Sequence, residues 1–246
     1  MVLKKFNLII NKKITPFSKI IKVDADKSIS IRSFLIGAIS HNISVANNIL
    51  ESDDVISAMN CIKKLGITIK KQKAKKYLIF GKGLGSFKLK KNGKLNFGNS
   101  GTLARLLIGI LSTTKDIKVK LSGDKSLNKR SMKSLIKLMN KFGASFVPKN
   151  KFNFPLKLIS SNMPVGISYK AGVSAQLKSA VMLAGLNSYG NTLITETERS
   201  RNHTENILLN NSKIIKIKDK QKKIITIFGK RYLDPIKIEV PNDPSS

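Results

Sequence analysis

Apolar residues recur at helical spacing in two stretches that both end at a glycine. After Asp53 and Asp54, apolar side chains continue at this spacing to Leu65, and Gly66 follows. The same pattern runs from residue 132 to residue 142 and ends at Gly143. Glycine commonly ends a helix because it adopts positive φ at low cost. A strand-like run follows each glycine, so the pattern predicts one helix–glycine–strand arrangement used twice, 77 positions apart.

Three further apolar helices are predicted, each after a short polar turn. Residues 27–39 predict an amphipathic helix that either Asp26 or Ser28 caps, and similar helices follow residues 99–102 and 172–176. The helix starts Ser28, Thr102 and Ser174 are 74 and 72 residues apart. Such regular spacing indicates one unit, roughly β-α-β-α-β-β, used three times. The third unit is degenerate, because its second helix has no glycine at its end.

The remaining elements are predicted from alternation and from turn residues. Residues 123–130 predict a polar loop, and residues 200–205 predict a helix start with Ser/Thr and Glu in a capping arrangement. Apolar runs and alternating apolar and polar residues predict strands. The predicted strands are residues 20–23, 67–69, 77–80, 94–97, 117–121, 144–147, 192–195, 224–228 and 236–240.

Each of the three helix starts is a candidate anion site. The first backbone N–H groups of a helix have no partner within it and lie at the positive end of the helix dipole. They suit a phosphate or a carboxylate, and Gly101 leaves room for close approach. The same turns also serve as plain helix caps. If a pseudo-threefold axis relates the units, the three sites would converge.

Composition restricts the class of protein. The chain has 246 residues, enough for one large or two smaller domains, and its net charge of +32 favours anionic partners. Many lysines lie in runs that also suit a solvated surface. The single cysteine, Cys61, excludes an internal disulfide and fits a reducing compartment, and it lies in a helix pattern that predicts a packed thiol. One cysteine and two histidines form no zinc pattern. Apolar runs are too short for a signal peptide or a membrane span, so a cytoplasmic protein is expected.

Five motifs identify a family. They occur in order at residues 26–32, 98–106, 123–130, 174–180 and 200–205. Together they closely resemble the EPSP synthase (3-phosphoshikimate 1-carboxyvinyltransferase) family over nearly the whole chain. The Ser-Ala-Gln sequence at 174–176 resembles the branch that includes glyphosate-tolerant bacterial enzymes.

The resemblance implies a fold and a reaction. The fold would be an α/β inverted barrel, with one complete domain of three repeats and a fragment of a second domain. The reaction would transfer the enolpyruvyl group of phosphoenolpyruvate to the 5-hydroxyl of shikimate 3-phosphate, releasing phosphate, on the pathway to aromatic amino acids. No metal or organic cofactor is implied, and neither is a specific nucleic acid or membrane partner. The protein is expected to be a monomer, with a separate C-terminal half as a partner that would complete it.

The resemblance also implies the residues of two binding sites. Those for shikimate 3-phosphate are Lys27, Ser28, Arg32, Ser174, Ala175, Gln176 and Arg201. Those for phosphoenolpyruvate are Lys27, Gly101, Arg130 and Gln176. The residue types suit this chemistry, because both substrates carry a phosphate and a carboxylate, which arginine binds with two parallel hydrogen bonds.

The sequence departs from the family pattern at several points. Ser131 replaces a usual proline after Arg130, which should alter the following helix start but not the arginine head group. Gly101 stands where alanine is associated with glyphosate tolerance, so glyphosate is expected to compete with phosphoenolpyruvate. Residues 241–246 resemble the entry into the family's remaining domain, which would carry the acidic proton acceptor.

These departures predict a domain organisation. Residues 1–22 are expected to belong to a largely missing second domain, residues 23–236 to the three-repeat domain, and residues 237–246 to the crossover between them. The chain alone is therefore expected to bind shikimate 3-phosphate with little or no turnover, because catalysis in the family requires both domains to close on the substrates.

Two other functions remain as alternatives. One is enolpyruvyl transfer to a UDP-sugar, but that family uses a cysteine near its site, and Cys61 lies in a different motif context. The other is a basic nucleic-acid-binding protein. The charge favours it, but aromatic residues make up only 6% of the chain and do not interleave with basic stretches. A non-catalytic remnant or one half of a split enzyme would share the fold of the first hypothesis.

Overall fold

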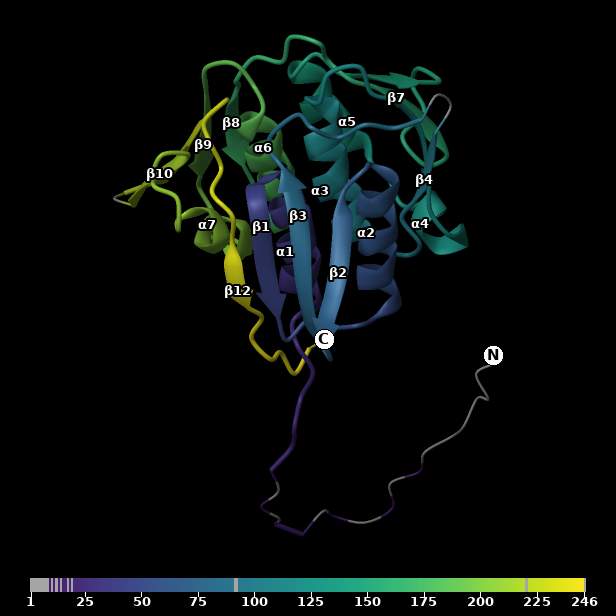
Figure 1. Ribbon diagram of the computed structural model, residues 1–246, viewed down its shortest axis with the longest axis vertical. Helices are drawn as coiled ribbons and strands as arrows, with labels where there is room; N and C mark the ends of the chain where they lie inside the picture. The colour runs from purple at the N-terminus through teal and green to yellow at the C-terminus, as the bar shows by residue number, and fades with distance from the viewer. Residues whose placement is uncertain are drawn as a thin grey trace.

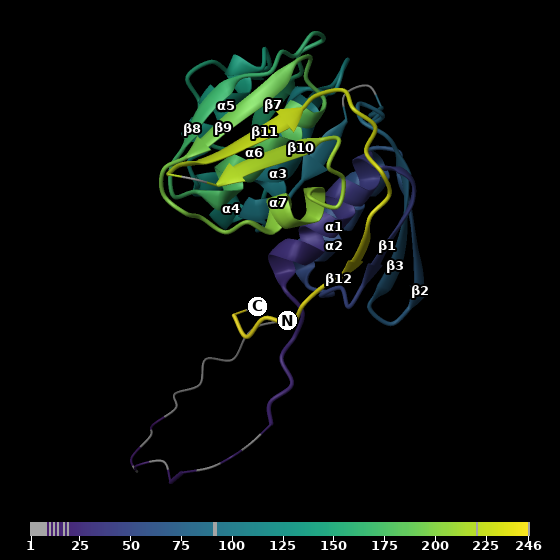
Figure 2. The same ribbon diagram turned by 90° about the vertical axis from the view of Figure 1, so that its left-hand side faces the viewer.

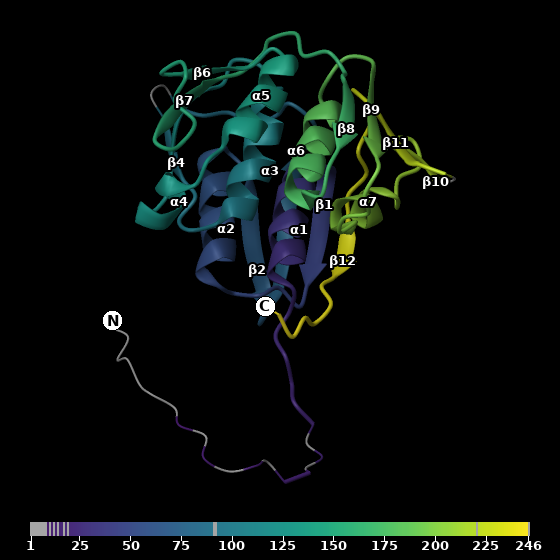
Figure 3. The ribbon, with the colours of Figure 1, turned by 180° about the vertical axis from the view of Figure 1, so that it is seen from behind.

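The computed structural model describes residues 9, 11, 13, 15–16, 18, 20–90, 93–219 and 221–245. Three four-stranded sheets surround a group of helices. The sheet of the first unit, called sheet 1, lies in front of the helices in Figure 1. The sheet of the third unit, called sheet 3, faces the viewer in Figure 2. From behind, the central helices come to the front (Figure 3). Helices inside and sheets outside form the α/β architecture that the sequence predicts.

Sheet 1 belongs to the first unit and has the order β12-β1-β3-β2. Its elements are α1 (Lys27–Ile39), β1 (His41–Asn47), α2 (Asp53–Lys64), β2 (Thr68–Lys73), β3 (Lys76–Lys82) and β12 (Lys237–Glu239). The strand β12 runs parallel to β1, with Val45 opposite Lys237. The first strand of this unit therefore comes from the other end of the described chain.

Sheets 2 and 3 repeat this order with their own first strands, as β4-β5-β7-β6 and β8-β9-β11-β10. The second unit consists of β4 (Lys94–Asn96), α3 (Gly101–Ser112), β5 (Lys118–Ser122), α4 (Lys125–Lys129), α5 (Lys133–Lys141), β6 (Ser145–Val147) and β7 (Leu156–Ile159). The third consists of β8 (Ser168–Ala171), α6 (Ala175–Leu186), β9 (Asn191–Glu196), α7 (His203–Leu208), β10 (Ile215–Asp219) and β11 (Lys223–Phe228). In each sheet the first two strands are parallel and the others pair antiparallel. The predicted threefold repeat is confirmed.

The predicted strand at residues 20–23 is wrong. These residues form no strand, and Ile20 and Ile21 are exposed. The place beside β1 is taken by β12, which confirms a strand within 236–240 and puts it in sheet 1. Most of residues 1–19 lie outside the described residues, so the assignment of residues 1–22 to a second domain stays a prediction, as do the other domain boundaries.

The core is formed by α1, α3 and α6, which are buried almost all round. Residues 30–39 of α1 are all buried, so the predicted amphipathic helix is instead a central helix. The helices α3 and α6 approach closely: a Cβ on Gly109 would lie 2.5 Å from the carbonyl oxygen of Ala180. A side chain at position 109 would force the two helices apart.

The N-cap residues of α1, α3 and α6 recur at a regular spacing. Asp26 caps α1 by accepting from the backbone N–H of Ile29 at 2.6 Å, so Asp26 and not Ser28 is the cap. Ser100 and Ser174 cap α3 and α6 in the same way. The three caps are 74 residues apart in both intervals.

Two further predictions about local structure are wrong. Residues 125–129 of the predicted loop form the short helix α4, because the side chain of Asp124 caps it. At α7 the N-cap is Asn202, whose side chain makes no capping hydrogen bond, and the Glu205 carboxylate pairs with Lys178 and not with the helix start. The strands β1, β7, β8 and β10 are not among the predicted strands. Gly66 and Gly143 both have positive φ, +88° and +91°, which confirms the two predicted helix ends.

Candidate anion-binding site

Two pockets lie at the N-termini of the central helices. The first, of about 410 Å³, is called the α1/α6 pocket. It is lined by Ser28, Arg32, Val173, Ser174, Ala175, Gln176, Arg199, Ser200, Arg201 and His203. It contains six of the seven residues predicted to bind shikimate 3-phosphate, all except Lys27.

Arg32 is the buried cation of the α1/α6 pocket. It lies on α1, is only 3% exposed, and its Nε donates to Thr204 Oγ1 at 2.8 Å. Its Nη2 donates to Ser179 Oγ at 3.2 Å, and Thr204 Oγ1 in turn donates to Ser179 Oγ at 2.8 Å. Burial lowers the pKa of Arg32 to about 10, against the opposing effect of the Asp26 and Glu205 carboxylates. The guanidinium is therefore charged at neutral pH and held in one orientation.

The other wall of this pocket is the segment between β9 and α7. Ser200 in this segment is held in place by Glu196, because its N–H and Oγ both donate to Glu196 Oε1, at 2.9 and 2.7 Å. Arg201 is exposed at the pocket. His203 begins α7, and burial together with the charge of Arg32 lowers its pKa. The segment adds two exposed arginines and one imidazole to the pocket.

The second pocket, called the α3 pocket, has a volume of about 360 Å³. It is lined by Lys27, Asp54, Asn99, Gly101, Thr102, Arg105, Arg130 and Gln176. All four residues predicted to bind phosphoenolpyruvate are among them. Lys27 forms an ion pair of 3.4 Å with Asp54, which orients its ammonium group at the pocket.

Arginine side chains crowd the α3 pocket around Gly101. Arg130 Nη2 donates to Asn99 Oδ1 at 2.9 Å, and Arg105 Nη1 donates to the carbonyl oxygen of Gly101 at 3.1 Å. Burial and the charge of the neighbouring Arg130 lower the pKa of Arg105. An anion placed here would relieve the repulsion.

Gln176 joins the two pockets. It lines both, and its Nε2 donates to Thr102 Oγ1 at 2.9 Å, which ties the start of α6 to the start of α3. The nine residues proposed by motif match therefore line two adjoining pockets. The predicted convergence of the helix starts is present in the structure.

Sequence reasoning missed several residues of these pockets. Arg105 and Asp54 line the α3 pocket, and His203 and Arg199 line the α1/α6 pocket. The position of Arg105, one helical turn after Gly101, was an available signal. Ser131 Oγ accepts from the N–H of Lys133 beside the start of α5, and Arg130 lines the α3 pocket.

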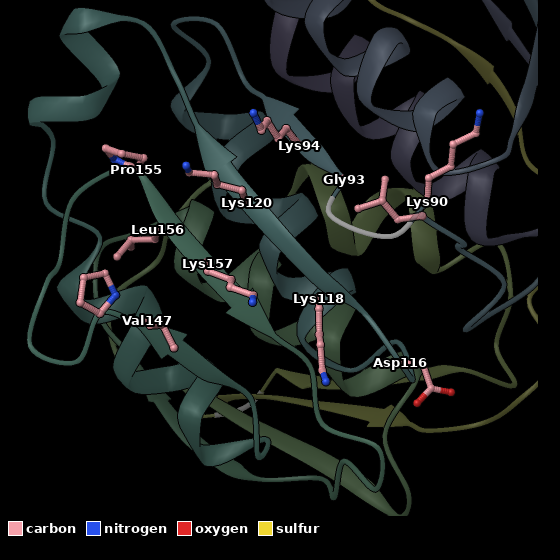
Figure 4. Close-up of a pocket in the computed structure, with 12 residues that line it drawn as sticks. Lys90, Gly93, Lys94, Asp116, Lys118, Lys120, Val147, Pro155, Leu156 and Lys157 are labelled. Carbon is pink, nitrogen blue, oxygen red and sulfur yellow. The ribbon is translucent and has the colours of Figure 1, made fainter.

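A cavity larger than these two pockets lies elsewhere, on the outer face of sheet 2. Its volume is about 600 Å³, and its floor includes Val147 and Leu156. Its rim includes Lys90, Lys94, Lys118, Lys120 and Lys157. Figure 4 shows these lysines pointing in different directions, with their ammonium groups apart. They do not converge on one anion, and no predicted site residue lines this cavity.

Other kinds of site have little support in the described ranges. Among the described residues, no three histidine, cysteine or acidic side chains lie where they could hold a metal ion. In the same part of the chain, no helix is long and apolar enough to cross a bilayer. Cys61 is buried, and burial raises the pKa of its thiol to about 12, so it is a packed thiol as predicted.

Fold and pockets together define a three-unit α/β domain with arginines and hydroxyls gathered at helix N-termini. The family model described as EPSP synthase (3-phosphoshikimate 1-carboxyvinyltransferase) matches residues 11–246. The chain belongs to the EPSP synthase family.

Individual relatives agree with the family model. A 3-phosphoshikimate 1-carboxyvinyltransferase of Paramagnetospirillum magneticum is 36% identical over 239 residues, covering 96% of this chain and 53% of the relative. That of Bacillus pumilus is 38% identical over 234 residues, covering 94% and 53%. The chain thus spans about half the length of the curated relatives it matches.

Solved structures share the fold. The EPSP synthase from Acinetobacter baumannii superposes with a TM-score of 0.82 at 34% identity, covering 92% of this chain and 50% of that one. The enolpyruvyl transferase NikO from Streptomyces tendae superposes with a TM-score of 0.68 at 11% identity, which shows a common fold.

Proposed function

We propose that this chain forms the shikimate 3-phosphate-binding half of a 3-phosphoshikimate 1-carboxyvinyltransferase. One observation carries the proposal: nine residues selected by motif match, from five separate stretches, line two adjoining pockets that share Gln176. A basic surface alone would not gather these particular residues at three helix starts.

The geometry suits two substrates side by side that each carry a phosphate and a carboxylate. In the α1/α6 pocket, Arg32 and the hydroxyls of Ser28 and Ser174 would hold shikimate 3-phosphate, with Arg201 at the open edge. In the α3 pocket, Lys27 and Arg130 would hold phosphoenolpyruvate over the N–H groups at the start of α3. Gln176 lies where both substrates would meet.

The reaction proposed for the completed enzyme joins these two substrates. The 5-hydroxyl oxygen of shikimate 3-phosphate forms a bond to C2 of phosphoenolpyruvate, and the bond from C2 to the phosphate oxygen breaks. Phosphate leaves with the hydroxyl proton, and the carboxyvinyl group stays on the ring. The cations of both pockets would stabilise the charge on the substrates and on the leaving phosphate.

The chain alone is proposed to bind but not to turn over. It spans about half the length of its relatives, and closure of two halves around the substrates would be needed to exclude water. We propose a monomer in the cytoplasm, completed by a C-terminal half. Light scattering on the pure chain tests the monomer, and normal synthase activity of the pure 246-residue chain would contradict the binding-only role.

Calorimetric titration of shikimate 3-phosphate tests the proposed function. We expect saturable binding that needs both the ring and the phosphate, so shikimate and inorganic phosphate should bind much more weakly. Arg32→Ala should weaken binding by about tenfold or more, because it removes a charge-assisted hydrogen-bond donor. Arg231→Ala is the matched control, since Arg231 is exposed and lines neither pocket. Binding matched by inorganic phosphate would refute the proposal.

A further inference from the structure

Lys178 is fully buried, and its ammonium group lies between two carboxylates. Its Nζ is 2.7 Å from Glu196 Oε1 and 2.6 Å from Glu205 Oε1, and both acidic side chains are only 1% exposed. Lys223 Nζ approaches the same carboxylates at 3.4 and 3.7 Å. These four residues are called the Lys178 cluster. Two positive and two negative charges make it neutral overall.

The Lys178 cluster holds both ends of the segment that forms one wall of the α1/α6 pocket. Glu196, at the end of β9, accepts both hydrogen bonds from Ser200. Glu205, in α7, lies two residues after His203. Lys178 itself lies on α6 in the turn that follows Ser174, because its N–H donates to the carbonyl oxygen of Ser174. One ammonium group therefore ties together the start of α6 and both ends of the Ser200–His203 wall.

Two residues next to the cluster in the sequence accept hydrogen bonds from Arg32. Thr204 precedes Glu205, and Ser179 follows Lys178. Thr204 Oγ1 donates a hydrogen bond to Ser179 Oγ, and each of the two oxygens accepts a hydrogen bond from the Arg32 guanidinium. Ion pairs and this hydrogen-bonded trio thus join α6 to α7 side by side. A shift of Glu205 would carry Thr204, and with it the hydrogen bond to Arg32 Nε.

We propose that the Lys178 cluster is a positioning device, which fixes Arg32 and the Ser200–His203 wall to receive the phosphate of the ligand. The ligand part of this proposal rests on the proposed function. Buried ion pairs add little net stability compared with apolar residues of the same shape, but losing one partner leaves a buried charge unpaired. Charges in this place are therefore better explained by the geometry that they impose than by stability. The cluster touches no substrate itself.

The first test needs no ligand. The side-chain Nε–H of Arg32 is hydrogen-bonded and buried, so it should give a resolved, slowly exchanging NMR signal in the wild-type chain. Glu205→Gln keeps the size of the side chain but removes its charge. We expect the folded variant to show a shifted Arg32 signal with hydrogen exchange faster by about tenfold or more. Lys178→Met is the second variant and should act in the same direction.

The matched control is Glu51→Gln. Glu51 also lies 2.7 Å from a lysine, Lys71, but the pair is solvent-exposed and outside both pockets. This variant should leave the Arg32 signal as in the wild type. A native Arg32 signal and native exchange in folded Glu205→Gln would overturn the proposal. So would unfolding of both cluster variants, because the cluster would then serve the fold as a whole.

The second test adds the ligand. Shikimate 3-phosphate should bind Glu205→Gln about tenfold more weakly than wild type, with Glu51→Gln unchanged. If the wild-type chain binds no shikimate 3-phosphate, the proposed function fails, and the NMR comparison still decides the positioning role. Equal affinity of wild type and folded Glu205→Gln would overturn the positioning of the phosphate site.

Discussion

Gly101 is the residue that leaves room between the arginines of the α3 pocket. A Cβ at this position would lie 2.7 Å from Arg105 Nη1 and 3.3 Å from Arg130 Nη1. Both atoms are the ends of flexible side chains, so Gly101→Ala should fold. The added methyl group would move both guanidinium groups and narrow the pocket. In an enzyme completed with its C-terminal half, we expect the inhibition constant of glyphosate to rise by roughly 10- to 200-fold, the range that one methyl group produces in a tight pocket.

Inhibition kinetics against phosphoenolpyruvate measure this effect. Gly172→Ala is the control, because a Cβ at Gly172 meets nothing within 4 Å. Competition between glyphosate and phosphoenolpyruvate is expected in both the wild type and the control. An unchanged inhibition constant in Gly101→Ala would show that the inhibitor does not approach Gly101.

Glu196 links the Lys178 cluster to acid stability. Burial alone would raise its pKa, but hydrogen bonds from Lys178 and Ser200 lower it to about 2. Its folded pKa is thus below the unfolded value, so its contribution to stability is complete above about pH 4.5 and is lost as the pH falls towards 2. Glu196→Gln should lack this contribution. The stability gap between wild type and variant, roughly 2 to 3 kcal/mol at pH 7, should shrink steadily below pH 4.5.

Urea unfolding of both proteins at pH 7, 4 and 3 measures the gap. Glu51→Gln is again a useful comparison, because the pKa of Glu51 is also lowered, chiefly by the Lys71 side chain, but in an exposed pair. A gap between wild type and Glu196→Gln that stays constant with pH would contradict the assigned protonation behaviour.

At the scale of single residues, the sequence predicted the residues that line the two pockets better than the buried ion pairs behind them. Motif matching found Arg32 and Gln176, which line the pockets. It could not find Lys178, because a lysine in an apolar helix reads as a solvated charge unless its partners are known. Glu196 and Glu205 lie 18 and 27 positions later, and only the fold brings them to Lys178. The capping arrangement predicted for Glu205 failed for the same reason.

At the scale of elements, close approach of α3 and α6 sets the geometry between the two pockets. Gly109→Ala would place a Cβ 2.5 Å from the backbone oxygen of Ala180, which cannot rotate away. We expect the free energy of unfolding to fall by about 1 to 3 kcal/mol, the usual cost of overpacking a core. Urea unfolding measures the loss. Gly172→Ala should change stability by less than about 0.5 kcal/mol, and equal stability of the two variants would contradict the close packing.

Helices were predictable where apolar spacing and a glycine end coincided, as in α2 and α5. Strands were missed where polar residues alternate with too few apolar ones. In β1 only Ser44 and Ala46 are buried, and β10 carries lysine and aspartate at its exposed positions. The helix α4 was missed because its five residues are too few to show helical spacing of apolar side chains. The side chain of Asp124 caps this helix by accepting from the N–H of Leu127.

At the scale of the whole molecule, the charge of +32 remains largely outside the pockets. The lysines on the outer face of sheet 2 point apart, as Figure 4 shows, and the exposed positions of the strands carry many of the others. Such a surface would bind polyanions weakly and with a steep dependence on salt. Binding at the pockets depends on buried and oriented groups such as Arg32 and should be less sensitive to salt.

The order of strands in sheet 1 could not be predicted from local sequence, because the partner of β1 lies 192 positions away. Val45 pairs with Lys237, and beside it the backbone N–H of Asp26 donates to the carbonyl oxygen of Pro241 at 2.8 Å. Ala25 also forms a bridge with Asn242. The alternation of apolar and polar residues indicated a strand near residues 236–240. Its pairing partner, β1, is known only from the fold. Residues 25–26 and 237–242, far apart in the sequence, thus lie together at the first unit.

Removal of residues 237–246 tests this contact. The deletion takes away the parallel partner of β1 and the buried side chains of Ile238 and Val240. Burial of two such side chains contributes roughly 3 to 6 kcal/mol, so we expect a clearly lower melting temperature by calorimetry. Removal of residues 244–246 alone is the control and should leave it unchanged. If the longer deletion also left the melting temperature unchanged, residues 237–246 would act only as a crossover, and sheet 1 would be stable with three strands.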